Sequence, residues 1–309
     1  MTASDLSPAD QGLAAIVPGR LAATREADDL PDSVVDPDHK RVVKEALEWQ
    51  QSGGQAWFWE MGATHRGADQ DRAYVLAGQM ASAGEQIGLA YAAGNEVAIW
   101  RDFRTNNDPD VAHELPMRGM AEAQCLFVMS TGHAFANVGL KALALDPGLK
   151  SELAGNFGGS SRSPSFDPFS TDRRDWVSMN RVTCKALKAV AQSSAELDVV
   201  ELIEPVVEFG FGAAWRELDE RRGEDFHRWR PQSHGVDGVL QKTPWSSDGK
   251  TRTLKMGNPT YDEAQGLADD VAHIGQAAML ALARAMERFR QQWAQTSVLL
   301  GGPEFGSTS

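Results

Sequence analysis

The residues whose types could do chemistry are concentrated in one segment, 224–235, which reads EDFHRWRPQSHG. This segment holds two histidines, a tryptophan and several charged side chains at the end of a long helical pattern. Histidine titrates near neutral pH and arginine binds anions through its planar guanidinium, so these are the residue types of a catalytic or anion-binding site. The chain contains no Walker loop, zinc-type cysteine cluster or nucleophile elbow. The sequence is therefore compatible with several competing hypotheses about function.

Arg228 and His234 are separated by five residues, which matches the Arg-x(4–6)-His signature of the HEPN superfamily of helical bundles. The chain also resembles that superfamily in its helical pattern with small residues on buried faces. The resemblance implies a metal-independent endoribonuclease that works as a homodimer. In that enzyme His234 would exchange a proton with the RNA 2′-hydroxyl, and Arg228 would hold the scissile phosphate. His227, Arg230 and Gln232 would support them.

The surroundings of this motif leave a structural alternative open. HEPN proteins usually carry the motif at the start of a helix, whereas here Pro231 and Gly235 interrupt the segment. In the alternative, Arg228 pairs with a nearby acid such as Glu224, and His234 caps a turn. A relative that keeps the bundle without catalysis is therefore part of the same hypothesis.

A second pattern consists of acidic residues three positions before a histidine, which share one helix face and can hold a divalent metal in a bundle. With seven histidines in the chain, about one such pair is expected by chance. The sequence has four of them: Asp36/His39, Asp110/His113, Glu224/His227 and Asp270/His273. The first two follow Asp-Pro-Asp sequences, which are typical of helix starts.

The other two pairs carry the metal hypothesis. Asp270 and His273 flank the apolar seam of the last helical pattern and are expected to face an interface. A metal-dependent enzyme would combine them with Glu224 and His227. A buried hydrogen bond between Asp270 and His273 explains the same pattern without a metal.

Other polar residues lie within or beside apolar helical patterns. His133 interrupts an apolar run and is expected to be buried, either facing a cavity or bonded to a carbonyl or carboxylate. Arg101 and Arg104 lie close together beside Trp100. They could bind an anion, although a solvated helix end is the simpler interpretation.

Composition restricts the class of protein. The net charge of −13 disfavours binding to DNA or to anionic membranes, and it also opposes the approach of RNA. The two cysteines form no disulfide pattern, and no signal peptide or membrane-spanning segment is apparent. We therefore expect a cytoplasmic, non-membrane protein whose partners are RNA or a second copy of itself, with no cofactor unless the metal hypothesis holds.

The pattern of apolar residues predicts an all-α fold, a multi-helix bundle with one small β-hairpin inserted before the last helix. Residues 1–35 are expected to form a flexible arm, 36–299 a single helical domain of about six or seven helices, and 300–309 a disordered tail. An Asp-Gly pair between strand-like residues predicts the hairpin at about 241–256. The predicted helices span about 38–51, 69–91, 117–145, 171–194, 197–222 and 261–298.

The sequence also predicts where two helices end or bend, which residue caps a third, and where a loop lies. Pro147 is expected to end the central helix, and Pro205 to kink or restart the helix of 197–222. Thr171 is expected to cap the helix that runs to Ser194. The Gly-, Ser- and Pro-rich segment 155–170 is expected to be a mobile loop. In a further functional hypothesis, this loop and the Trp-rich first helices bind a partner or a small ligand without catalysis.

Overall fold

The protein is described by a computed structural model that is almost entirely helical. The structure describes residues 37–51, 68–105, 111–157, 166–170, 172, 175–194, 197–227 and 261–299. Within these ranges there are eight helices and no strand, so the all-α prediction is confirmed. The helices are α2 (Pro37–Gln50), α4 (Ala68–Thr105), α5 (Val111–Leu143), α6 (Pro147–Phe157), α7 (Arg181–Ser193), α8 (Leu197–Phe211), α9 (Ala213–His227) and α11 (Tyr261–Leu299). The predicted hairpin at 241–256 lies outside the described residues.

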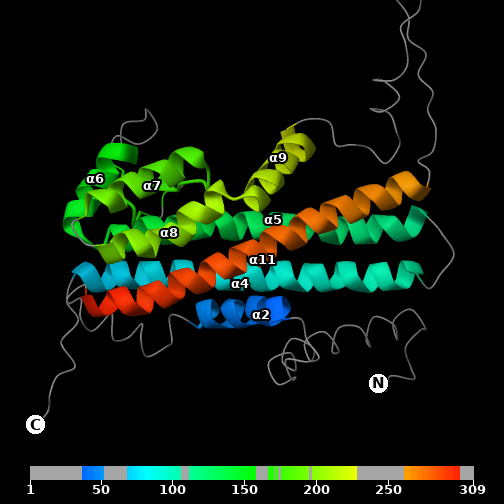
Figure 1. Ribbon diagram of the computed structural model, residues 1–309, viewed down its shortest axis with the longest axis horizontal. Coiled ribbons are helices and arrows are strands. Elements are labelled where there is room, and N and C mark those ends of the chain that lie inside the picture. Colours follow the sequence, from blue (N-terminus) through cyan, green and yellow to red (C-terminus); the bar gives the residue numbers. More distant parts are fainter. Residues whose placement is uncertain are drawn as a thin grey trace, which may run out of the picture.

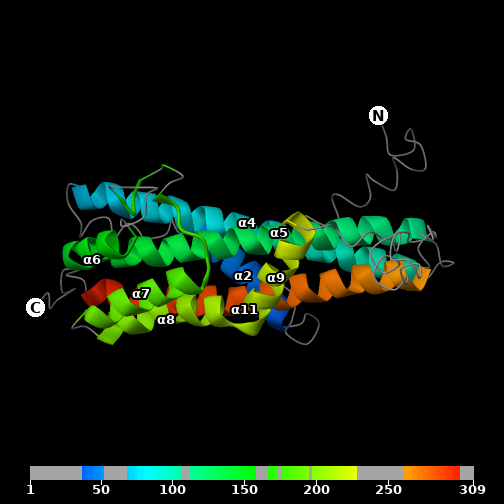
Figure 2. The same cartoon turned by 90° about the horizontal axis from the view of Figure 1, so that it is seen from above.

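Three long helices, α4, α5 and α11, form the body of the molecule and lie side by side along its long axis (Figures 1 and 2). They contain 38, 33 and 39 residues, which corresponds to lengths of about 50–60 Å at 1.5 Å per residue. The helix α5 runs back along α4, α2 packs against α4 and α11, and α6, α7 and α8 gather at one end. None of the helices in the described ranges has the length and hydropathy needed to cross a membrane.

The close contact between α2 and α4 depends on a glycine. A Cβ atom at Gly84 would lie 2.3 Å from the backbone nitrogen of Gln50 and 2.8 Å from the carbonyl oxygen of Ala46. Contacts this short with backbone atoms cannot be relieved by side-chain rotation. Glycine at this position therefore sets the distance between the two helices.

A buried ion pair joins α2 to α11. Arg290 donates from Nε and Nη2 to the two carboxylate oxygens of Glu45, at 3.0 and 2.6 Å. Glu45 is completely buried, so this two-point contact compensates the desolvation of its charge.

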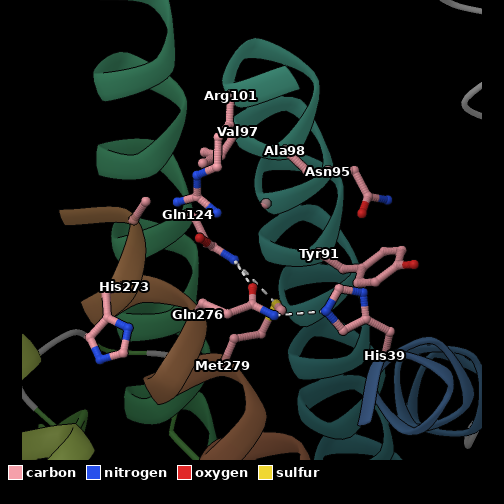
Figure 3. Close-up of a pocket in the computed structure, with 12 residues that line it drawn as sticks. His39, Tyr91, Asn95, Val97, Ala98, Arg101, Gln124, His273, Gln276 and Met279 are labelled. Atoms are coloured by element: carbon pink, nitrogen blue, oxygen red, sulfur yellow. Dashed lines mark hydrogen bonds between the residues drawn. The ribbon is translucent and has the colours of Figure 1, made fainter. Parts of the chain in front are cut away.

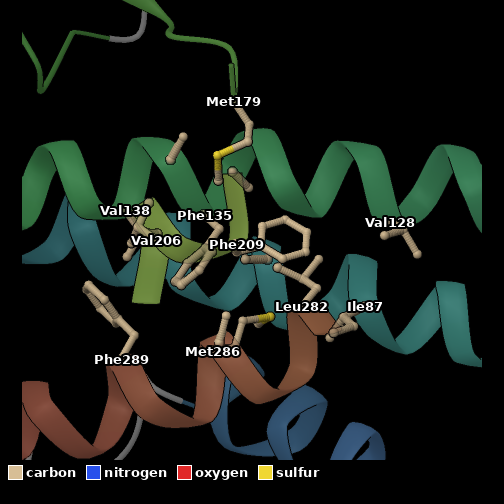
Figure 4. Close-up of a cluster of buried hydrophobic side chains, with 14 of the residues drawn as sticks. Ile87, Val128, Phe135, Val138, Met179, Val206, Phe209, Leu282, Met286 and Phe289 are labelled. Atoms are coloured by element: carbon tan, nitrogen blue, oxygen red, sulfur yellow. The ribbon is translucent and has the colours of Figure 1, made fainter. Parts of the chain in front are cut away.

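The hydrophobic core lies where α4, α5, α8 and α11 meet (Figure 4). The rings of Phe135 and Phe289 meet edge to face with centroids 5.6 Å apart, and Trp49 from α2 packs edge to face on Phe135 at 5.7 Å. All three side chains are fully buried. Burial of each contributes about 1.5–3 kcal/mol, so this aromatic cluster is a principal stabilising contact between the helices.

The number of helices exceeds the prediction because the starts of two helices, α6 and α9, were missed. Asp146 and Pro147 end the central helix but also begin α6: the Asp146 carboxylate accepts from the backbone nitrogens of Gly148 and Leu149 at 2.7 and 3.0 Å, and Pro147 occupies the first helical position. The second break lies at Gly212, after the helix has continued through Pro205. Gly155–Phe157, predicted to be loop, belong to α6.

The start of α7 also differs from the prediction. The helix begins at Arg181, and the Asn180 side chain caps it by accepting from the backbone nitrogen of Thr183 at 2.9 Å. Thr171 is therefore not the cap. The preceding backbone is held in an irregular conformation by α5, through Asn137, which accepts from the nitrogen of Val177 at 3.1 Å and donates to its carbonyl at 2.7 Å.

Candidate functional site

The residues of the predicted ribonuclease site lie at or beyond the end of α9. Arg228, Arg230, Gln232 and His234 are outside the described residues. His227 is the last residue of α9 and Glu224 lies one turn before it, but the described part of the chain does not include their side chains. The catalytic assignment stays a prediction.

Asp270 and His273 lie in the first half of α11, and both side chains are exposed. Arg221 of α9 donates to the Asp270 carboxylate at 3.3 Å. The predicted buried hydrogen bond between Asp270 and His273 is therefore wrong, because the carboxylate turns toward a cation on the neighbouring helix. Among the described residues there is no group of three or more histidine, cysteine or acidic side chains that could hold a metal. A metal site that includes Glu224 and His227 stays a prediction.

His133 has a structural role. Its Nδ1 accepts from the backbone nitrogen of Met179 at 2.9 Å, and its ring meets Trp215 edge to face at 5.6 Å. Together with Asn137, one turn further along α5, it fixes the segment that leads into α7. The half-buried ring thus bonds a backbone amide.

A polar cavity of about 230 Å³ lies between α2, α4, α5 and α11 (Figure 3). We call it the four-helix cavity. Its lining consists of His39, Tyr91, Gly94, Asn95, Val97, Ala98, Arg101, Gln124, Ala272, His273, Gln276 and Met279.

A chain of hydrogen bonds crosses the four-helix cavity. Gln124 Nε2 donates to Gln276 Oε1 at 3.2 Å, and Gln276 Nε2 lies 2.9 Å from Nε2 of His39 (Figure 3). With the amide in this orientation, Gln276 donates and Nε2 of His39 accepts. The histidine ring is held by Tyr91, which it meets edge to face at 5.9 Å. Side chains from three helices are thereby connected.

Two glycines make room for Gln124. A Cβ atom at Gly94 on α4 would lie 2.4 Å from the Gln124 amide nitrogen, and one at Gly275 on α11 would lie 3.0 Å from its amide oxygen. Gln124 is buried and also contacts the sulfur of Met279 at 3.6 Å. The Gln124 amide thus fits between α4 and α11 because Gly94 and Gly275 have no side chains there, and a larger residue at either position would exclude it.

Arg101 lines the cavity from α4, next to a network of charges. Its Nε lies 3.5 Å from Asp269, and Arg104 contacts both oxygens of the same carboxylate at 3.2 Å. Arg104 also donates to Glu114 at 3.1 Å. Burial lowers the pKa of Arg104, but its hydrogen bonds to Asp269 and Glu114 outweigh this and raise the pKa above its usual value.

This network corrects the interpretation of the two arginines as a solvated helix end. Arg104 and Glu114 expose only 9% and 2% of their side chains, whereas Arg101 exposes 46%. The reason is that α5 and α11 both cover this part of α4. Arg104 therefore connects α4 to α5 and α11, whereas Arg101 is partly exposed and lines the four-helix cavity.

The sequence contained partial signals of this site. His39 and His273 were noticed, but as helix-start and metal-pair residues. Gln124 and Gln276 each interrupt an apolar helical face, and such buried polar positions often mark a site rather than a stable core. Nothing in the order of residues shows that they meet, because they are 152 positions apart.

Comparison of the chain with protein-family models, with curated proteins and with solved structures gave no match. The site is therefore interpreted from its own geometry and chemistry.

Proposed function

We propose that the protein binds a small polar molecule in the four-helix cavity, as a ligand-binding helical bundle. The observation that carries this proposal is the chain of Gln124, Gln276 and His39 along an open cavity between four helices. Helix interfaces normally close such spaces with apolar side chains, because protein interiors are close-packed. Polar side chains at a helix interface cost stability unless they are hydrogen-bonded, and Gln124, Gln276 and His39 meet this requirement through one another while they line a cavity that a small polar molecule can enter.

The size of the cavity limits the ligand. Pockets for drug-sized molecules measure about 300–1,000 Å³, and this cavity measures about 230 Å³. The ligand is therefore smaller than a typical nucleotide cofactor. This site differs from the partner surface predicted at the first helices and at 155–170, since most of the residues that line the cavity come from α4 and α11.

The test fills the cavity from its rim. Ala98 lies at the exposed edge of the cavity on α4, and Ala98→Leu adds an apolar group there at a cost in helix propensity of only a few tenths of a kcal/mol. Ala92→Leu is the matched control, because Ala92 is also exposed on α4 and does not line the cavity. Benzoate, benzamide, succinate and 1,4-butanediamine serve as probes in ligand-observed NMR.

We expect at least one probe to bind the wild-type protein and the Ala92→Leu variant, and to lose most of its affinity for Ala98→Leu. Equal binding by all three proteins would place the ligand elsewhere. If no probe binds the wild type, the cavity has no affinity for this range of small polar chemistry and the proposal fails.

A metal-independent ribonuclease is the second candidate, and it rests on the spacing of Arg228 and His234, which follow the last described residue of α9, His227. Purified wild-type protein and His234→Ala are incubated with total RNA in EDTA at low salt. We expect cleavage by the wild type alone, because only His234 would provide the proton transfer. Cleavage by neither protein, or equally by both, contradicts this assignment, and Ala98→Leu should leave any cleavage unchanged.

A further inference from the structure

The four-helix cavity is lined by basic side chains and by no acidic ones, although the chain as a whole is acidic. The protein has 43 acidic and 30 basic residues, so its composition alone would place more than one acid among the lining residues of an average cavity. The residues that line this one include Arg101, His39 and His273 and no aspartate or glutamate. A ligand in the cavity therefore meets a cation and two imidazoles.

Arg101 is oriented for an anion by the charges behind it. Its Nε faces Asp269, and both oxygens of that carboxylate are also held by Arg104. Among the described residues, Asp269 is the charged partner of Arg101, and the two terminal nitrogens of the guanidinium point toward Gln124 (Figure 3). Two parallel N–H donors at this spacing match the two oxygens of a carboxylate.

The polar groups beside Arg101 are amides. Gln124 donates to Gln276, and Gln276 donates to Nε2 of His39. They follow Arg101 in a line across the cavity (Figure 3). A second negative charge on the ligand would find no second arginine or lysine among the lining residues.

Apolar side chains complete the wall. Val97, Ala272 and Met279 lie behind the cavity surface and are nearly fully buried, whereas Ala98 is exposed at its edge. Their surfaces favour an uncharged carbon body over a strongly hydrated one.

We propose that the ligand of the four-helix cavity is a small organic monocarboxylate, with its carboxylate on Arg101 and its uncharged body along the apolar wall that ends at Ala98. This inference rests on the proposed function and specifies its ligand. Benzoate and benzamide test it, because they share a shape and differ in charge.

The experiment measures the affinities of benzoate, benzamide and succinate by calorimetry for the wild type, Arg101→Gln and Arg288→Gln. Arg288 is the matched control: its side chain is 49% exposed against 46% for Arg101, it also pairs with acidic residues, and it lies on α11 about 18 Å beyond Gln276. Arg101→Lys keeps the charge without the paired donors.

We expect succinate to bind the wild type less tightly than benzoate, because its second carboxylate meets no arginine or lysine among the lining residues. Benzoate should bind about tenfold more tightly than benzamide, since a charge-assisted contact is worth about that factor at a half-exposed site. Arg101→Gln should remove this preference and leave the affinity for benzamide unchanged. Arg101→Lys should be intermediate, and Arg288→Gln should behave as the wild type. Thermal unfolding of each variant verifies that it is folded.

Benzamide binding as tightly as benzoate, or an unchanged preference in Arg101→Gln, overturns the carboxylate assignment while cavity binding stands. Tighter binding of succinate than benzoate overturns the restriction to one carboxylate. Absence of binding by these three and by 1,4-butanediamine counts against cavity binding itself, and the carboxylate assignment then falls with it.

Discussion

At the scale of single residues, burial of the Lys141 side chain disfavours its charged form. It is only 4% exposed near the end of α5, with its ammonium group 5.8 Å from the ring centre of Trp176. Burial lowers the pKa of Lys141 to about 8 from 10.5, and the charge of Asp167 opposes only part of that shift. The folded state therefore holds a proton less tightly here than the unfolded chain does.

This shift predicts how stability depends on pH. Below pH 8 the lysine is charged in both states, and burial of the charge costs up to about 3 kcal/mol. Between pH 8 and 10.5 the unfolded state binds more protons, so this residue's contribution to the free energy of unfolding rises with pH. We expect Lys141→Met to be more stable than the wild type at pH 7.5, and the difference to shrink by pH 10.5. Urea unfolding of both proteins measures it, and a difference independent of pH would contradict the assignment.

At the scale of elements, helix contacts in this protein are set by small residues as much as by large ones. Gly84 brings α4 against the backbone of α2, and Gly94 and Gly275 admit the Gln124 amide between helices. The short distance between α4 and its neighbours is thus a precondition of the four-helix cavity.

A pair of substitutions on α4 tests this view. Gly84→Ala places a Cβ atom 2.3 Å from backbone of α2, and overpacking of this kind costs about 1–3 kcal/mol. Gly78→Ala has no atom within 4 Å of the added Cβ and should gain up to about 1 kcal/mol from helix propensity. Chemical denaturation should therefore shift the two variants in opposite directions. Stabilisation by both would show that α2 moves away at little cost.

At the scale of the whole molecule, the four-helix cavity draws on segments that are distant in the sequence. The histidine comes from α2, the arginine from α4, and the glutamines from α5 and α11. A ligand that contacts all four helices binds the folded state alone, so it should stabilise the protein in proportion to its affinity. Stability and binding are therefore linked through the same four elements.

The sequence by itself determined the helical class and the positions of the first and last described helices. The apolar spacing of 261–298 matches α11 within one residue, and that of 38–51 matches α2 within one residue, because a helix repeats its buried face every three or four positions. It also indicated His39 and His273, although with other roles, and it offered anion binding as one role for Arg101 and Arg104.

Only the tertiary structure decided the boundaries and the site. Asp146 caps a new helix and Asn180 replaces Thr171 as a cap, because local signals of helix start are common and the packed partner selects among them. Asp270 turned out to pair with Arg221 instead of His273, since a neighbouring helix supplied the better partner. Gln124 and Gln276 meet across 152 positions, and contacts at that separation depend on how the helices pack, which no local pattern records.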